Sequence, residues 1–179
     1  EATLKSGVTA SPYYAESLVK DIELTIGGQR IDKHYQRWWR LYSELYLDEA
    51  KKANWGKMTS NSKSGVSNKV FLPLIFFFNR NPGLFLPLIA LQYHEVRLDI
   101  DLSSVYDSYF TGAPKVWANY VYLDTEERRR FAQKGHEYLI EQVQHTGVDT
   151  VDGNTQQVRL SYNHPVKELV WCYSNTATV

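Results

Sequence analysis

The chain has 179 residues, with 20 Lys and Arg against 20 Asp and Glu. Because these charges balance, no long-range field attracts phosphates or anionic lipids, which argues against a general nucleic-acid-binding protein. Hydrophobic residues form 43% and aromatic residues 14% of the sequence, enough apolar material to exclude a disordered chain. The 13 Tyr and 5 Trp favour a strand-rich domain, since aromatic side chains pack well on a pleated sheet.

Residues 18–26, "LVKDIELTI", alternate apolar and polar side chains, which predicts a strand with one solvated face that ends at Gly27 and Gly28. Asp32 is then a candidate N-cap for an amphipathic helix of about four turns. Its apolar positions recur three and four residues apart at Tyr35, Trp38, Trp39, Tyr42, Leu45 and Tyr46. This aromatic stripe could stack on bases or sugars, but packing on a sheet is the commoner role.

The segment at 54–69 is rich in Ser, Asn, Gly and Lys, which predicts an exposed loop. Residues 70–78, "VFLPLIFFF", predict a strand buried on both faces, followed by a turn at 79–83 in which Pro82 and Gly83 supply the special backbone angles. The next apolar run, 84–92, predicts a short helix or coil.

A membrane hairpin is the alternative interpretation of these two apolar runs. A spanning helix needs about 20 continuous apolar residues. The runs have nine and eight, and "NRNPG" divides them. Because an arginine and unpaired backbone groups are costly in lipid, the sequence favours a buried core.

Two further strands and a helix are predicted next. Residues 93–102 alternate, with four apolar side chains expected to point inward, Val96, Leu98, Ile100 and Leu102. Residues 115–124 form another strand candidate. Asp124 is a predicted N-cap, Glu127 stands at the capping-box position, and Gly135 is expected to end the helix.

The remaining residues predict an inter-domain linker and new strands. Residues 136–144 fit a helix or a strand, and their alternation favours a strand. A Gly, Asp and Thr-rich loop covers 145–156, and strands are predicted at 157–162 and 166–173. A second domain is therefore expected to begin near Gln156.

The single cysteine, Cys172, excludes an intrachain disulfide and cannot build a zinc site. It lies in the apolar segment "ELVWCYSN", so we expect it to be buried in a strand. The sequence starts with Glu1 and shows no secretory leader, and it stops shortly after a strand-like run. We therefore expect it to be a segment of a longer protein.

The search for catalytic motifs finds no complete one. His136 and Glu137 resemble the start of a zinc-protease helix, but Ile140 stands where the second histidine is needed. Neither a phosphate-binding glycine loop nor a nucleophile elbow is present. Five histidines are scattered singly along the chain, at positions 34, 94, 136, 145 and 164. The sequence therefore predicts no catalytic, metal or cofactor-binding residues.

Two charged clusters are more simply explained as solvated surface. Asp99 and Asp101 lie on one strand face and could share a proton or a divalent cation, but polar strand faces commonly carry such pairs. Arg128, Arg129 and Arg130 could bind phosphate, but glutamates neighbour them, and an i, i+4 pair from Glu126 to Arg130 is expected.

Four blocks in order resemble the major capsid proteins of nucleocytoplasmic large DNA viruses, the double jelly-roll family. These blocks are "IGGQRIDKHYQRWW" at 26–39, "LPLIFFFNRNPGLFLPLIALQYHEVRL" at 72–98, "YVYLDTEERRRFAQKGHEYLIEQVQ" at 120–144 and "NHPVKELVW" at 163–171. As a set they are highly specific, because four idiosyncratic blocks in one order seldom arise by chance.

The resemblance implies a mainly β fold, an antiparallel jelly-roll sandwich with short helices in its connections, as part of a double jelly roll. Residues 1–145 would be the later part of the first jelly roll, 146–156 a linker, and 157–179 the start of the second. The sequence agrees with this class, since jelly rolls need alternating strands, aromatic core residues and long corner loops.

The resemblance further implies a structural protein rather than an enzyme, a late virion protein that forms an icosahedral capsid from homotrimeric, pseudo-hexagonal capsomers. The expected partners are two further copies, neighbouring capsomers and minor capsid proteins, with no direct nucleic-acid contact. The subunit would assemble in the host cell cytoplasm, close to an inner viral membrane without inserting in it.

Two rival functions remain open at this point. A jelly-roll module could bind carbohydrate or a receptor, with Trp38, Trp39 or Trp55 offering stacking faces. A cupin-type hydrolase or oxygenase would need clustered histidine and carboxylate ligands on neighbouring strands.

Overall fold

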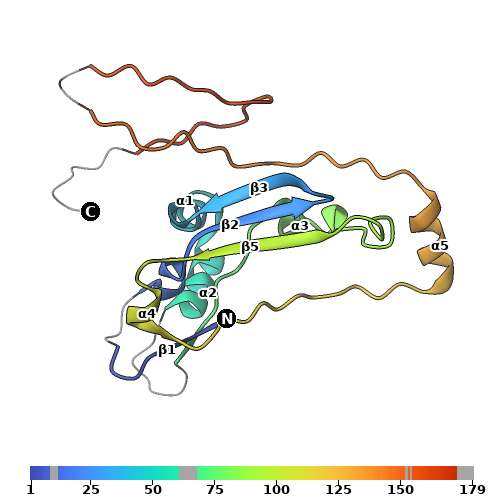
Figure 1. Cartoon of the computed structure of the whole chain (residues 1–179), viewed down its shortest axis with the longest axis horizontal. Coiled ribbons are helices and arrows are strands. Elements are labelled where there is room, and N and C mark those ends of the chain that lie inside the picture. Colours follow the sequence, from blue (N-terminus) through green and yellow to red (C-terminus); the bar gives the residue numbers. More distant parts are fainter. Residues whose placement is uncertain (9–11, 61–67, 152, 154, 173–179) are drawn as a thin grey trace. The chain divides into compact units, whose positions relative to one another are not determined.

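A computed structural model of the chain describes residues 1–8, 12–60, 68–151, 153 and 155–172 (Figure 1). The chain divides into two compact units, Glu1–Val143 (the first unit) and Gln144–Val179 (the second unit). All helices and strands of the described residues lie in the first unit.

The larger sheet has three antiparallel strands in the order β3-β2-β5. The central strand β2 spans Val19–Ile26, β3 spans Gln29–Tyr35, and β5 spans Val96–Leu102. Gly27 and Gly28 join β2 to β3 with φ angles of 59° and 80°. Positive φ at both central residues is the geometry of a two-residue hairpin, so the predicted strand and its glycine end are confirmed.

The hairpin overturns the predicted start of the first helix. Asp32 does not cap a helix, because it lies within β3 opposite Leu24 of β2. The helix α1 begins at Gln36 and spans Gln36–Tyr46, with Tyr35 at its N-cap, and its 11 residues make about three turns instead of four. Pairing with β2 places residues 29–35 in the sheet, and the helical aromatic stripe begins only after that ladder ends.

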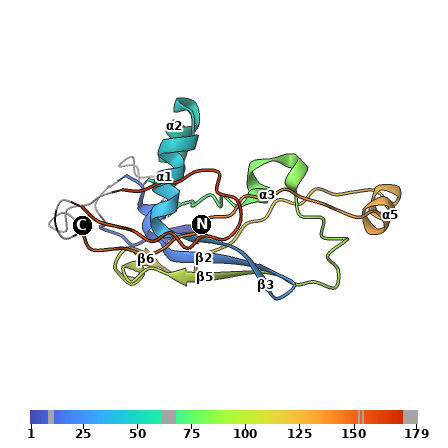
Figure 2. The ribbon, with the colours of Figure 1, turned by 90° about the horizontal axis from the view of Figure 1, so that it is seen from above.

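The smaller sheet is antiparallel in the order β4-β1-β6. Its strands are short, with β1 at Ala2–Leu4, β4 at Lys69–Val70 and β6 at Phe110–Thr111. One hydrophobic core joins both sheets, because buried side chains from each belong to the same cluster. In Figure 2, the helices α1, α2 and α3 lie on the same side of the larger sheet.

A second helix, α2, spans Glu49–Thr59, so the prediction of an exposed loop beginning at residue 54 is wrong. Asp48 caps this helix by accepting a 2.8 Å hydrogen bond from Lys51 N. Trp55 and Thr59 are buried, which anchors the helix to the core. Residues 61–67 of the predicted loop lie outside the described residues.

The apolar run at 70–78 is buried in large part, but it is not a continuous strand. Only Lys69–Val70 joins a ladder. Pro73 lacks an N–H for a ladder bond, and its carbonyl accepts a 3.0 Å hydrogen bond from Trp39 Nε1. The run ends in the short helix α3, Phe77–Arg80, and the 3₁₀ turn η2, Pro82–Leu84. Asn81 caps η2 through its side chain, and Gly83 is not among the positive-φ residues.

Residues 88–94 form consecutive turns, in agreement with the predicted coil, and lead into β5. Val96, Leu98 and Ile100 of β5 pack against the core as predicted. Leu102 is 40% exposed, so its predicted inward position is wrong. It lies at the end of the strand, opposite Val19.

The connections carry three more short helices: η1 at Tyr14–Ser17, α4 at Tyr106–Tyr109 and α5 at Thr125–Gln133. Asp124 caps α5 by accepting a 2.9 Å hydrogen bond from Glu127 N, which confirms that prediction. α5 ends at Gln133 with Lys134 at the C-cap, so Gly135 directly follows the helix as predicted, although its φ is not positive.

Two extended segments flank α5, the first arm at 113–124 and the second arm at 134–143, and α5 lies at their far end from the sheets (Figures 1 and 2). Neither arm belongs to a strand ladder, so the strands predicted at 115–124 and 136–144 are not present. In the second arm Tyr138 and Ile140 still pack against the core. The second arm therefore has the alternating side chains of a strand, but a hydrogen-bonded ladder also needs a partner strand.

The described residues of the second unit contain no regular helix or strand. The strands predicted at 157–162 and 166–173 are therefore not formed in the residues described, and residue 173 lies outside them. Cys172 is exposed, so its predicted burial is wrong. Gln144 and Asn163 close a loop through two side-chain to backbone hydrogen bonds of 2.9 and 3.0 Å.

Candidate functional site

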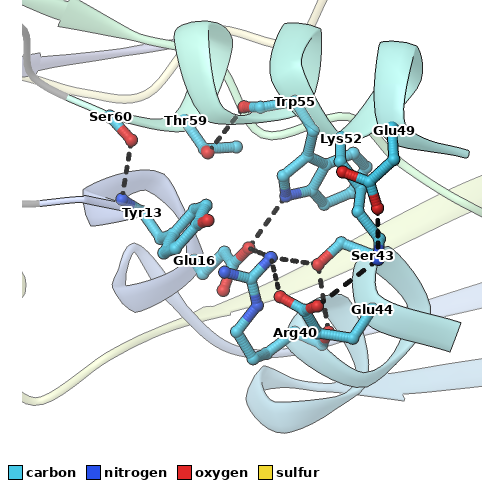
Figure 3. A network of polar contacts seen from close by, with 10 residues as sticks. All are labelled: Tyr13, Glu16, Arg40, Ser43, Glu44, Glu49, Lys52, Trp55, Thr59 and Ser60. Atoms are coloured by element: carbon cyan, nitrogen blue, oxygen red, sulfur yellow. Dashed lines mark hydrogen bonds and ion pairs between the residues drawn. The ribbon is translucent and has the colours of Figure 1, made fainter. Parts of the chain in front are cut away.

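A buried polar network ties η1 to both long helices (Figure 3). The Glu16 carboxylate accepts a 2.8 Å hydrogen bond from Trp55 Nε1 of α2 and lies 3.6 Å from the Arg40 guanidinium of α1. The same guanidinium lies over the Tyr13 ring, 3.6 Å from its centroid. Three segments distant in sequence therefore meet at one carboxylate.

Burial raises the pKa of Glu16 above its ordinary value of 4.5, and this desolvation outweighs the opposing effects of the Trp55 hydrogen bond and Arg40. Glu44 also favours the neutral form. The network also includes the buried Ser43 of α1, whose hydroxyl contacts the Arg40 guanidinium.

A second buried pair lies in β3. The side chains of Asp32 and His34 are both fully buried, and Asp32 Oδ2 lies 2.9 Å from His34 Nε2. The His34 ring stacks on Phe76 with centroids 4.3 Å apart. This pair was not predicted, because Asp32 was expected to cap a helix and the five histidines are scattered singly along the sequence.

The tryptophans considered for sugar binding are mostly unavailable. Trp39 is 0% and Trp55 is 4% exposed, so neither offers a stacking face to a ligand. Trp38 is half-buried and lies beside the rings of Tyr42 and Tyr46, at 6.2 Å from each. The aromatic stripe thus packs mainly into the protein, as the commoner of the two roles predicts.

The acidic pair and the histidine that were considered as ligands, and explained otherwise, lie in separate places. Asp99 pairs with Arg97 at 2.9 Å on the exposed face of β5, which it shares with Asp101. His136 contacts the Phe131 carbonyl. Among the residues that the structure describes, no three histidine, cysteine or carboxylate side chains are placed to hold one metal ion.

The arginines of α5 pair with glutamates on the same helix. Arg129 lies 2.9 Å from Glu126, and Arg130 lies 3.0 Å from Glu127. These are i, i+3 pairs, so the expected pair from Glu126 to Arg130 is wrong. The pairs partly neutralise the basic cluster, which argues against a dedicated phosphate site.

The most unusual surface is apolar and lies on the first arm. Trp117 is 73% and Tyr122 is 91% exposed, and Val116, Tyr120 and Val121 are also exposed. We call Val116–Tyr122 the apolar edge. A contiguous apolar stretch of this kind on a soluble surface usually marks a protein interface.

The start of the apolar edge is connected to the smaller sheet. Lys115 N donates a 2.9 Å hydrogen bond to the Glu1 carbonyl, next to β1. Trp117 Nε1 donates to the Glu1 carboxylate at 2.8 Å, and this bond together with Lys69 lowers the pKa of Glu1. The apolar edge thus follows β6 in the chain and starts beside Glu1, the residue before β1.

The second unit is also rich in exposed apolar side chains. Within its described residues these are Val148, Val151, Val158, Leu160, Val166, Leu169, Val170 and Trp171. Val158 and Leu160 alternate with polar residues, the pattern typical of a half-buried strand, although no strand is formed there in the described residues. No helix in the described part of the chain is both long and apolar enough to cross a membrane.

Comparison with known families decides what kind of protein carries these surfaces. Residues 1–124 match the family described as "Major capsid protein N-terminus", and residues 127–179 match "Large eukaryotic DNA virus major capsid protein". The chain belongs to the major capsid protein family of large eukaryotic DNA viruses. The family resemblance inferred from the four sequence blocks is confirmed.

Individual relatives agree with this family. The chain is 47% identical to the major capsid protein of Paramecium bursaria Chlorella virus 1, over 93% of this chain and 43% of that protein. It is 41% identical to the major capsid protein of Pyramimonas orientalis virus, over 96% of this chain and 47% of that protein. The chain therefore spans less than half the length of these relatives. Because the relatives are capsid proteins, the prediction of a structural family rather than an enzyme is confirmed.

Solved structures extend the similarity to the fold. The crystal structure of PBCV-1 VP54, fitted into a reconstruction of the virophage Sputnik, superposes with a TM-score of 0.65 at 46% identity. The match covers 79% of this chain and 38% of that one, as does a match to a quasi-atomic model of the PBCV-1 virus capsid. The antiparallel sheets with short connecting helices are thus shared with a capsid protein.

Proposed function

We propose that the chain is part of a structural subunit that self-assembles into trimeric, pseudo-hexagonal capsomers of an icosahedral viral capsid. Family membership carries this proposal, since both family matches and the two relatives described above are major capsid proteins. The capsid role belongs to the complete protein, of which this chain corresponds to less than half.

The complete subunit on this proposal is a double jelly roll. Residues 1–145 form the later part of the first roll, 146–156 the linker, and 157–179 the start of the second. The division of the chain after Val143 supports a boundary in this region. The second arm supports the assignment as well, because it carries the alternation of a strand without a ladder in the described residues.

The exposed apolar surfaces support assembly. Trp117, Tyr122 and Trp171 expose most of their surface, and burying apolar area contributes about 25 cal/mol per Å². In the complete subunit, we expect further strands of the jelly rolls and neighbouring copies to cover these side chains. Formal net charge of zero also limits repulsion between many copies packed side by side.

The same proposal places the protein in the virion, assembled in the host cell cytoplasm. Its partners are two copies in the capsomer, neighbouring capsomers and minor capsid proteins. It lies near an inner viral membrane without inserting and makes no direct contact with nucleic acid.

The test is to express the full-length subunit and measure its mass by light scattering at micromolar concentration. We expect a mass three times that of one full-length subunit, and pseudo-hexagonal particles by electron microscopy. A monomer at all concentrations tested would contradict the capsomer proposal while leaving the family assignment intact.

A further inference from the structure

Asp32 occupies a position where a charged side chain is costly. Its carboxylate is fully buried in β3 and lies 2.9 Å from His34, whose ring stacks on Phe76. Desolvating a carboxylate costs several kcal/mol unless its oxygens are partnered. If the side chain at position 32 only filled space in the core, an apolar residue would serve better. The role of Asp32 therefore follows from the groups that its carboxylate contacts.

One oxygen of the Asp32 carboxylate lies against a buried side chain of the core. Asp32 Oδ2 lies 2.9 Å from His34 Nε2, at ion-pair distance but without the alignment of a hydrogen bond. The His34 ring is fixed in turn, because it stacks on Phe76 and meets the edge of Trp39 with centroids 6.0 Å apart. This packing restricts the rotation of the Asp32 side chain and orients its other oxygen.

The other oxygen reaches a segment far along the chain. Asp32 Oδ1 accepts hydrogen bonds of 2.9 Å from Lys33 N and from Val143 N, 111 residues later. Beside it, the Gln142 side-chain amide donates to the carbonyl oxygen of Ile31. Two consecutive residues of β3 thus hold two consecutive residues of the second arm.

These contacts lie at the very end of the first unit. Val143 is the last residue of the first unit, and Gln144 begins the second. Other contacts of the arm lie before its end, such as Tyr138 Oη donating to the Phe85 carbonyl at 3.0 Å and Glu141 pairing with Arg80 at 3.0 Å. The bonds at Gln142 and Val143 hold the end itself.

We propose that Asp32 is a positioning residue whose buried carboxylate binds the Val143 amide, a contact we call the clasp. This contact fixes the point and direction in which the chain leaves the first unit. A carboxylate suits this role because hydrogen bonds to a charged acceptor are about twice as strong as neutral ones. The clasp acts within the 179-residue chain, so it does not depend on capsid assembly.

Hydrogen exchange tests the clasp directly. Asp32→Asn keeps the size of the side chain and removes its charge, and we expect the Val143 amide of the 179-residue chain to exchange about tenfold faster. Gln142→Ala removes the neighbouring contact from an exposed position, and a smaller acceleration of a few-fold is expected. This second variant changes no buried group, so it keeps the test valid if Asp32→Asn folds poorly.

A matched control separates positioning from general stabilisation of the hairpin. Asp21→Asn removes a buried carboxylate from the same hairpin, where Asp21 pairs with Lys33 at 3.0 Å. We expect this control to leave exchange at Val143 unchanged. Equal acceleration in Asp21→Asn and Asp32→Asn, or none in Asp32→Asn and Gln142→Ala, would overturn the proposal.

A distance measurement supplies a readout that stability alone does not change. Spin labels are placed on the exposed sites Lys20→Cys in the first unit and Val148→Cys just beyond the clasp, in a Cys172→Ser background. We expect Asp32→Asn to broaden the distance distribution between the labels and Asp21→Asn to leave its width unchanged. Identical distributions for Asp32→Asn and the unsubstituted background would refute the positioning role.

Discussion

Trp55 Nε1 donates a 2.8 Å hydrogen bond to the Glu16 carboxylate, joining residues 39 positions apart in the chain. The bond links η1 to α2, and Arg40 of α1 approaches the same carboxylate from a third segment. Because Glu16 is buried, each of these partners offsets part of its desolvation. The network thus makes the packing of α1 and α2 depend on a single side chain.

Trp55→Phe is expected to destabilise the chain by about 1–3 kcal/mol, because the ring is retained while a buried carboxylate loses its hydrogen-bond donor. Urea unfolding followed by circular dichroism measures this change in the free energy of unfolding. Trp117→Phe is the matched control. It removes the indole N–H of a side chain that is 73% exposed, and its acceptor Glu1 keeps the ion pair with Lys69 at 3.0 Å, so a change within about 0.5 kcal/mol is expected. Equal losses for the two variants would refute the proposed importance of burial.

Glu16 also makes stability depend on pH in a definite direction. Its pKa is raised in the folded chain, so folding favours the protonated form. This contribution is fully present below the ordinary pKa of 4.5 and is lost as the pH rises through the raised value. We therefore expect the stability of the unsubstituted chain relative to Glu16→Gln to fall as the pH increases from about 4 to 7.

Unfolding free energies of both chains across this pH range provide the measurement. Parallel curves would show that Glu16 titrates normally. A relative gain for the unsubstituted chain with rising pH would show that attraction to Arg40 exceeds the desolvation of the Glu16 carboxylate, which is the opposite of the expected balance.

The apolar run at 70–78 gives a third prediction, since its function is to fill the core. Phe76 is fully buried and stacks on His34. Phe76→Ala should cost about 3–5 kcal/mol through lost burial and the cavity left behind. Phe85→Ala, at a site 46% exposed in the second apolar run, should cost less than about 1 kcal/mol. Urea midpoints of the two variants distinguish these outcomes, and similar midpoints would mean that Phe76 is not a core residue.

The parts of the fold that sequence predicts correctly are those whose pattern is local. The strand β2 shows strict alternation, and Asp124 precedes α5 with the spacing of a cap, so both follow from a few neighbouring residues. β3 was missed because Asp32 fits a helix cap as well as a strand. Only the hairpin at Gly27 and Gly28, which pairs β3 with β2, decides between the two.

Other features depend on partners that no local pattern shows. α2 has few apolar residues and no apolar stripe, so only its cap at Asp48 and its buried Trp55 reveal how it is held. The contact of Glu16 with Arg40 and Trp55 joins three separate segments. The second arm and the predicted strand at 157–162 alternate correctly, but no ladder forms in the described residues because strand formation requires a neighbour.

The apolar edge provides the last prediction, which rests on the proposed assembly. Tyr122 is 91% exposed, so Tyr122→Ser removes little buried area from the 179-residue chain, and its free energy of unfolding should change by less than about 0.5 kcal/mol. In the full-length subunit the same change removes an aromatic ring from a surface that is covered, and the trimer fraction by light scattering should fall. Tyr93→Ser is the control, because Tyr93 is 88% exposed in a turn away from the apolar edge. The role of the edge is refuted if Tyr122→Ser leaves the trimer fraction unchanged, or if Tyr93→Ser lowers it equally.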